Sequence, residues 1–218
     1  MHPQKIITNT EGKIMEPTSY DLALEAICIK GKEIYGPGYK ITSETEPVIL
    51  KLLTWFLLDE ARAAKEGISL NKGILLAGPI GCGKSALMRI FRSLASEVLP
   101  FAMISCDQVS LDFAKHGAVA IEQLTTRSFS VNDRPLARCF ENLGHEGNLS
   151  HYGDKTDLMR MILSVRYDLF IKYGMLTHIT TNLDPAEIEE RYGYRIRSCM
   201  REMFNIIAFP ASSPDLRK

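Results

Sequence analysis

The segment from residue 78 to residue 85 contains residue types that can hold a chain of phosphates. It reads GPIGCGKS and matches the pattern G-x-x-x-x-G-K-[ST]. Gly81 and Gly83 allow backbone torsions that a side chain would forbid, so successive N–H groups can turn onto phosphate oxygens. Lys84 can reach the outer phosphates as a point charge, and the Ser85 hydroxyl is a hard oxygen ligand for Mg²⁺. The segment is therefore predicted to be a P-loop that binds ATP with Mg²⁺.

The sequence around this segment is the context that a P-loop needs. An apolar run of strand length, GILLAG at residues 73–78, leads into the loop, and the helical stretch SALMRIFRSLASEVL follows it. The N-terminal end of such a helix favours a bound anion. We therefore predict that the nucleotide is bound by Gly78, Pro79, Gly81, Cys82, Gly83, Lys84, Ser85 and Ala86.

Composition places limits on partners and compartment. The chain is 218 residues long, and its 26 basic residues balance 26 acidic ones, so there is no bulk attraction to nucleic acid or to an acidic membrane. The five cysteines are odd in number and lack a CxxC spacing, which favours reduced thiols. The longest apolar run, residues 47–58, is too short to span a bilayer, and residues 1–10 lack the apolar region of a signal peptide. We expect a soluble, cytoplasmic protein with no membrane contact.

The N-terminal part of the chain is set apart by a break. Residues 17–34 read as a short helix, and YGPGYK at residues 35–40 then interrupts the chain with two glycines around a proline. We predict an N-terminal helical extension and linker at residues 1–45, followed by the main domain at residues 46–218. The main domain is expected to open with one helix from about Glu46 to Glu66.

Strands alternate with helices over the rest of the chain, which implies an α/β fold with a parallel sheet covered on both faces. A long helix is expected at about residues 155–173, and two short helices are expected to meet near Gly193. One strand lies between the P-loop strand and the strand that ends in acidic and polar residues, which is typical of the additional-strand (ASCE) P-loop fold of the AAA+ type. We predict a three-layer sandwich with sheet order 5-1-4-3-2. The expected strands are residues 73–78, 101–105, 135–140, 176–182 and 206–209.

Polar residues follow the third and fourth predicted strands, where they would face the phosphates. Glu141 and Asn142 follow the third strand, and Asn182 ends the fourth. A polar side chain at this edge can orient the attacking water beside the γ-phosphate. These three residues are our candidates for catalysis.

From about residue 70 to the C-terminus, the sequence resembles the DnaC and DnaI type bacterial helicase loaders and the related IstB-type transposition ATPases, including their phage and mobile-element relatives. The resemblance rests on GPIGCGKS, FENLG, HYGDKTDLMRMILSVRYDLF, THITTNL, RYGYRIRSCMREMF and the terminal DLRK. It implies an ATPase that acts on a replicative helicase or a transposase. It also implies assembly with ATP, in which one subunit's arginine completes its neighbour's site.

The sequence matches the family pattern at some functional positions and departs from it at others. Glu141 takes the magnesium-associated position, but Asn142 stands where the family has a catalytic acid, and an amide cannot accept a proton. Loss of a general base typically costs ~10²–10⁴ in rate. Cys199 stands where the resemblance puts an arginine finger, and Arg195, one helical turn earlier, is the candidate substitute. Arg217 aligns with a family arginine that senses nucleotide. ATP binding is expected; fast hydrolysis is not.

The leading interpretation is an ATP-dependent loader or remodeller of a DNA replication complex. The alternatives are a degenerate nucleotide-binding switch with little hydrolysis and an IstB-like transposition regulator. A small-molecule kinase would need an arginine-rich lid, which the sequence lacks. We expect a monomer that assembles only with ATP or a partner.

Two further contacts stay open. Tyr39 and Ile41 could pack on adenine or could simply make a linker contact. Residues 110–127 lie where helicase loaders contact single-stranded DNA. The segment could contact DNA here too, or it could be an ordinary amphipathic helix. The candidate DNA-contacting residues are Lys115, His116 and Arg127, with Phe113 and Phe129 as stacking groups.

Overall fold

The computed structural model describes residues 7–8, 14–15, 19–95, 99–146, 150–151, 154–155 and 158–217. Most of the predicted extension before Ser19, and the last residue of the DLRK segment, lie outside the described residues. The helices are α1 (Ser19–Tyr35), α2 (Glu46–Phe56), α3 (Glu60–Glu66), α4 (Lys84–Leu94), α5 (Cys106–His116), α6 (Ala118–Leu124), α7 (Leu158–Tyr173) and α8 (Pro185–Met203). The strands of the main sheet are β3 (Gly73–Ala77), β4 (Phe101–Ser105), β5 (Ala137–Leu143), β8 (Thr177–Thr181) and β9 (Phe204–Ala208). Two-residue antiparallel pairs are formed by β1 (Ile7–Thr8) with β2 (Ile14–Met15) and by β6 (Ser150–His151) with β7 (Asp154–Lys155).

The five long strands form one parallel sheet in the order β4-β5-β8-β3-β9. Read from the other edge and numbered along the chain, this is 5-1-4-3-2, so the predicted sheet order is confirmed. The P-loop strand β3 is flanked by β8 and β9. Because all five strands are parallel, the carboxyl ends of β3, β5 and β8 lie along the same side of the sheet, which we call its carboxyl edge.

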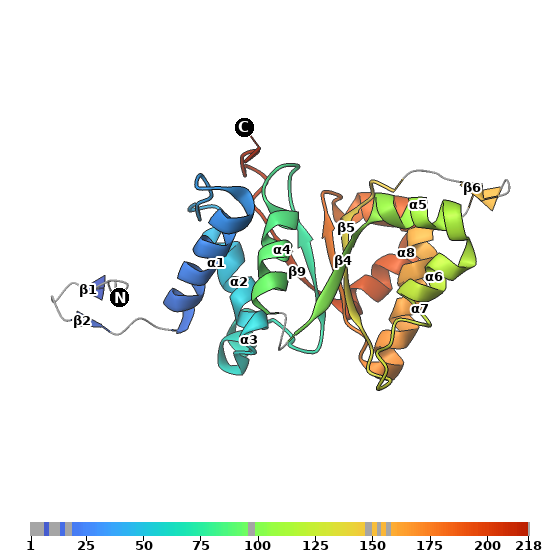
Figure 1. Cartoon of the computed structure of the whole chain (residues 1–218), viewed down its shortest axis with the longest axis horizontal. Helices are drawn as coiled ribbons and strands as arrows, with labels where there is room; N and C mark the ends of the chain where they lie inside the picture. Colours follow the sequence, from blue (N-terminus) through green and yellow to red (C-terminus); the bar gives the residue numbers. More distant parts are fainter. Residues whose placement is uncertain are drawn as a thin grey trace.

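Helices cover both faces of the sheet, as expected for a three-layer sandwich. Alternate residues of β3 enter different cores: Ile74 and Leu76 pack with α1, α2 and α4, whereas Leu75 packs with α5, α7 and α8. In Figure 1 the sheet stands between α1 to α4 on one side and α5 to α8 on the other. The short run GILLA can therefore be apolar throughout, because neither face of this strand meets water.

The helix predicted at Glu46–Glu66 is interrupted, so that prediction was wrong in its extent. Leu58 has a left-handed backbone with φ 54°. Asp59 then caps a new helix, and its side chain accepts the N–H of Arg62 at 2.9 Å. The local cap outweighs the apolar pattern that continues through this region.

By contrast, the predicted division near Gly193 is confirmed. Gly193 has φ 85° and ψ 158° inside α8, which separates two helical halves. Asp184 starts the first half with a capping box that includes Glu187.

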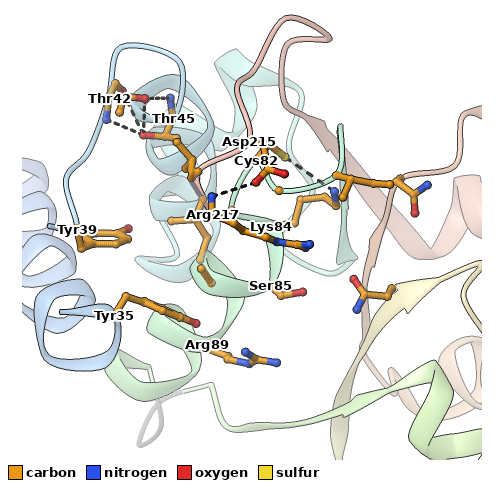
Figure 2. A pocket seen from close by; sticks show the side chains of 18 of the residues that line it. Tyr35, Tyr39, Thr42, Thr45, Cys82, Lys84, Ser85, Arg89, Asp215 and Arg217 are labelled. Carbon is orange, nitrogen blue, oxygen red and sulfur yellow. Dashed lines mark hydrogen bonds between the residues drawn. The ribbon is translucent and has the colours of Figure 1, made fainter.

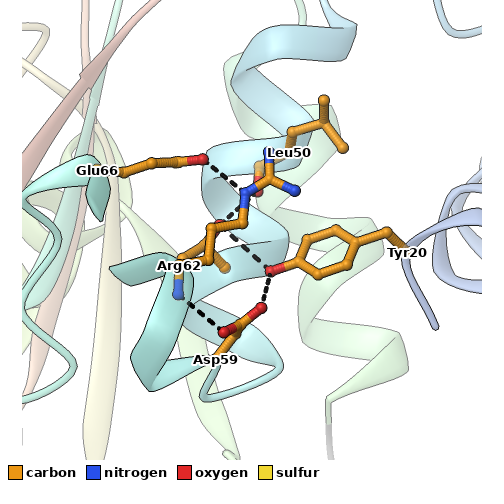
Figure 3. Close-up of polar contacts among 6 residues, drawn as sticks. Tyr20, Leu50, Asp59, Arg62 and Glu66 are labelled. Carbon is orange, nitrogen blue, oxygen red and sulfur yellow. Dashed lines mark hydrogen bonds and ion pairs between the residues drawn. The ribbon is translucent and has the colours of Figure 1, made fainter. Parts of the chain in front are cut away.

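Helix α1 is attached to the main domain by polar contacts. The Tyr20 hydroxyl donates to the Asp59 carboxylate at 2.8 Å, and the Arg62 guanidinium lies 4.5 Å from the centre of the Tyr20 ring (Figure 3). Arg62 Nε also contacts Glu66 at 2.6 Å.

The domain boundary that we place at residue 45 stays a prediction. Among the described residues, no helix is long and apolar enough to cross a membrane.

Candidate nucleotide-binding site

A cavity of about 920 Å³ opens over the P-loop, between α1 and the carboxyl edge of the sheet (Figure 2). Its walls are the P-loop with the first turns of α4, the connection between α1 and α2, the ends of β5 and β8, and a C-terminal tail at residues 215–217. Segments that are distant in the sequence therefore meet at one site. The volume is in the range of small-molecule and cofactor sites.

Glycine torsions shape the loop around this cavity. Gly81 has φ 82° and Gly83 has φ 100°, both in the left-handed region. Gly83 is the N-cap of α4, so the first free N–H groups of the helix point toward the cavity. Residues 81–86 line the cavity, whereas Gly78 and Pro79 face Lys84 instead. The loop thus has the form that a bound phosphate needs.

Lys84 lies at the centre of the loop. Its Nζ donates to the backbone oxygens of Gly78 and Pro79, each at 2.7 Å, and the residue is only 8% exposed. Burial lowers the pKa of the Lys84 ammonium, and the positive charge of Arg217 lowers it further. A buried cation held by neutral carbonyls is stabilised when an anion arrives beside it.

The C-terminal tail lies on the P-loop. The Leu216 N–H donates to the Gly81 oxygen at 3.0 Å, and the Arg217 N–H donates to Asp215 Oδ1 at 3.0 Å. This arrangement brings Arg217, the predicted nucleotide sensor, to the cavity wall. Figure 2 shows Arg217 and Lys84 in the same region of the site.

The ends of β5 and β8 supply two amides to the cavity. Asn142 has φ 58°, next to an irregularity in the pairing of β5 with β8, and its N–H donates to Thr180 Oγ1 at 3.0 Å. Asn182 Oδ1 lies 3.0 Å from His145 Nε2. Asn142, His145 and Asn182 all line the cavity. They can orient a water beside a bound phosphate.

Glu141 has a different environment from its neighbour. It is 5% exposed and does not line the cavity, and Arg89 Nη2 lies 2.9 Å and 3.1 Å from its two carboxylate oxygens. The Ser85 hydroxyl is an oxygen ligand that fits Mg²⁺. The Glu141 carboxylate fits it poorly, because a guanidinium already covers it.

The candidate finger lies away from this cavity. Arg195 is exposed on α8, and neither it nor Cys199 lines the cavity. Cys199 is 9% exposed, and burial raises the pKa of its thiol. Arg197 is paired with Glu189. A role for Arg195 in a neighbouring subunit's site stays a prediction.

The other wall of the cavity is aromatic. The rings of Tyr35 and Tyr39 are stacked, with centres 6.2 Å apart, and both residues line the cavity. The Tyr39 ring lies so close to Gly31 of α1 that an added Cβ would be 2.1 Å from it. Burial raises the pKa of Tyr39 to about 12. Ile41 packs against the hydrophobic core instead of lining the cavity.

The segment considered for DNA contact offers less than the sequence indicated. Phe113 is buried in the core, with 8% exposure, so it is not available to stack on a base. The Phe129 ring packs edge-on against Tyr173 at 5.4 Å, and Arg127 is paired with Glu122 at 3.1 Å. Direct DNA binding there stays a prediction.

Sequence reasoning missed several residues of the site: Tyr35, Arg89, His145 and Asp215. For Arg89 a signal existed, because it follows Ser85 by four positions and so must share its face of the helix. Asp215 reaches the site only through the path of the tail, which no local pattern reports.

Comparison with known protein families and with curated proteins gave no match. Among solved structures, the chain is similar to the DnaC helicase loader, with 17% identity, a TM-score of 0.57, and coverage of 79% of this chain and 93% of that one. A candidate primosome component from Streptococcus pyogenes serotype M3 has 15% identity, a TM-score of 0.52, and coverage of 87% and 97%. A DNA replication initiation factor has 12% identity, a TM-score of 0.54, and coverage of 78% and 47%. With the sheet order above, these similarities show the P-loop AAA+ α/β fold.

Proposed function

We propose that this chain is an ATP-binding AAA+ protein that loads or remodels a replicative helicase in a DNA replication complex. The observation that carries the proposal is the cavity over the P-loop, into which the first turn of α4 and residues 81–86 face. The similarity in fold to a helicase loader supports the choice of partner. That similarity is one of fold, so the partner must be tested separately.

The cavity suits a nucleotide at both ends. The triphosphate would lie on the P-loop, close to Lys84 and Arg217, with Mg²⁺ on the Ser85 hydroxyl. The base would lie toward Tyr35 and Tyr39, whose rings offer an apolar, stackable wall. The two ends are made by different segments, so a bound nucleotide would join the α1–α2 connection to the P-loop.

One observation favours a second candidate, a switch that uses nucleotide occupancy with little turnover. Asn142 occupies the cavity wall where a general base would stand, and its amide cannot take a proton from water. In this version ATP binding alone would change which partner the chain holds. Both candidates share the same nucleotide site.

Nucleotide binding is tested by calorimetric titration of ATP into wild type and Lys84→Ala. We expect the variant to bind at least about tenfold more weakly, a loss of about 1.4 kcal/mol or more. Thermal unfolding of both proteins controls for the fold. Equal affinity in the two proteins would contradict the assignment of the loop.

The partner is tested by light scattering of the chain with a purified replicative helicase. We expect a monomer in isolation and a larger complex with the helicase, changed in amount by ATP. In Lys84→Ala the complex should lose its response to ATP. A chain that binds ATP but never associates with the helicase would leave the nucleotide site intact and refute the loader role.

A further inference from the structure

A guanidinium covers the carboxylate that the sequence assigns to magnesium. The side chain of Glu141 is 7% exposed, and both of its oxygens lie within 3.1 Å of Arg89 Nη2. The side chain of Arg89 is 52% exposed and lines the cavity. The charged group that faces the cavity at this point is therefore the cation, with the anion behind it.

Arg89 projects from α4 between Glu141 of β5 and Tyr35 at the end of α1. It lies one helical turn after Ser85 on α4, so the guanidinium and the hydroxyl share one face of the helix. The Tyr35 side chain, at the end of α1, points toward Arg89 in Figure 2. Figure 2 shows Tyr35, Ser85 and Arg89 gathered below Lys84. Because the pair with Glu141 already holds the guanidinium, Arg89 loses less freedom when an anion binds than an unpaired arginine would.

The chemistry of this group matches that of a bound phosphate chain. The bonds to Glu141 involve one nitrogen, whereas a guanidinium has five N–H donors, so it can serve an anion at the same time. Bonds from arginine to phosphate are strong because both partners are charged. A divalent cation at Ser85 would meet a neighbouring positive charge instead of a free carboxylate.

We propose that Arg89 binds the phosphates of the nucleotide and supplies the positive charge that Mg²⁺ would otherwise provide. The chain then binds ATP with little dependence on Mg²⁺. This inference rests on the proposed nucleotide site and makes Arg89 a determinant of its specificity.

The test is the ATP affinity of wild type, Arg89→Met and Arg92→Met, each measured in excess Mg²⁺ and in EDTA. Arg92 is an exposed arginine of the same helix that does not line the cavity, so it controls for lost charge. For wild type, and likewise for Arg92→Met, the ATP affinity in excess Mg²⁺ should differ from that in EDTA by less than about fivefold, the effect of a screened charge. In EDTA, Arg89→Met should bind about 10–100-fold more weakly than wild type, the effect of one charged hydrogen bond.

A second variant keeps the test decisive if Arg89→Met unfolds because it leaves Glu141 buried and unpaired. Arg89→Met/Glu141→Gln removes both charges, and in EDTA it should show the same loss of affinity. A wild type that loses tenfold or more without Mg²⁺ would overturn the inference, as would either Arg89 variant binding like wild type in EDTA. If wild type binds no ATP in either condition, the proposed function itself fails, and that result is distinct from the other two.

Discussion

The carboxylate of Asp215 lies against the backbone of Gly81, so closely that a Cβ added to Gly81 would be 2.0 Å from Oδ1. The contact joins the C-terminal tail to the loop on which the phosphates would lie. It places a negative charge beside an anion-binding site. The tail therefore both completes the cavity, through Arg217, and opposes the charge of the nucleotide.

Replacing Asp215 with asparagine should raise the affinity for ATP by about fivefold at low salt, because one like charge near the phosphates is removed. Asparagine retains the oxygen that accepts the Arg217 N–H, so the tail keeps its local geometry. The measurement is a titration at low and high salt, and the gain should shrink at high salt. Asp133→Asn, exposed and outside the cavity wall, is the control. An unchanged affinity at low salt would show that the carboxylate does not oppose binding.

His178 should make the fold sensitive to acid. Its ring is enclosed by the rings of Trp55, Phe56 and Phe101, and its Nδ1 accepts the Ile74 N–H at 3.2 Å. Burial, with a smaller effect from Arg166, lowers the pKa of His178 from 6.5 to about 3. Between these two pKa values, His178 is therefore protonated in the unfolded chain and neutral in the folded chain. Stability is fully present above about pH 6.5 and is lost as pH falls toward 3.

Between pH 7 and pH 5, this residue should remove about 2 kcal/mol from the free energy of unfolding. Urea unfolding of wild type and His178→Asn at both pH values measures it. The variant is less stable at pH 7, but its loss on going to pH 5 should be about 2 kcal/mol smaller. His116→Asn, exposed on α5, should lose as much as wild type. Equal losses in wild type and His178→Asn would refute the assignment.

Arg166 should be the costliest single residue to remove from α7. It is fully buried, and it donates to the oxygens of Leu124 and Leu176 at 2.7 Å and to Thr177 Oγ1 at 2.8 Å. Burial lowers the pKa of its guanidinium. We expect Arg166→Met to lower the free energy of unfolding by about 3–5 kcal/mol, since these acceptors and the Leu136 oxygen lose their donor.

Urea unfolding of Arg166→Met and Arg166→Lys measures this cost, with the exposed Lys172→Met as control. Lysine keeps the charge but has fewer donors, so it should lose less than methionine. A cost near that of Lys172→Met would mean that the carbonyls find other donors.

Contiguous patterns could be predicted from the sequence, and contacts between distant segments could not. The P-loop is eight consecutive residues, and the alternation of strands with helices around it predicts a parallel sheet. The order of the strands came from the resemblance to the ASCE P-loop fold, and the structure confirms it. The pairing of Arg89 with Glu141 joins positions 52 residues apart, and no local sequence pattern around either residue predicts it.

Two further features were hidden by the hydrophobic pattern. In the helix at residues 155–173, apolar spacing favours burial of Val165 and Leu169, but both are only half-buried, whereas Arg166 beside them is fully buried. A periodic pattern assigns polar residues to the surface, so it cannot find a buried cation whose partners are backbone oxygens. The break at Leu58 was likewise masked, because apolar residues continue on both sides of it.

The catalytic question turns on Asn142, which lines the cavity with φ 58°. We expect phosphate release by wild type to be near background, because no proton acceptor occupies this position. Asn142→Glu should raise it, by up to about 10²-fold if the base is the only missing group. The left-handed backbone disfavours glutamate, so part of that gain will be offset by strain. Asn142→Gln has the same length and strain but no base, and it should give no increase.

The two candidate positions for an arginine finger, Cys199 and Arg195, differ in exposure, so their variants are not equally useful in a hydrolysis assay. Cys199 is 9% exposed, so Cys199→Arg would bury a guanidinium and disturb α8 before it could reach a neighbour. Arg195 is exposed and is the better probe. In the Asn142→Glu background, Arg195→Ala should lower phosphate release only at protein concentrations where subunits meet, since a finger acts across an interface. Brisk hydrolysis by wild type that Asn142→Glu does not raise would refute the interpretation as a nucleotide switch with little turnover. His145, which lies 3.0 Å from Asn182 at the cavity wall, would then be the next residue to test as the base.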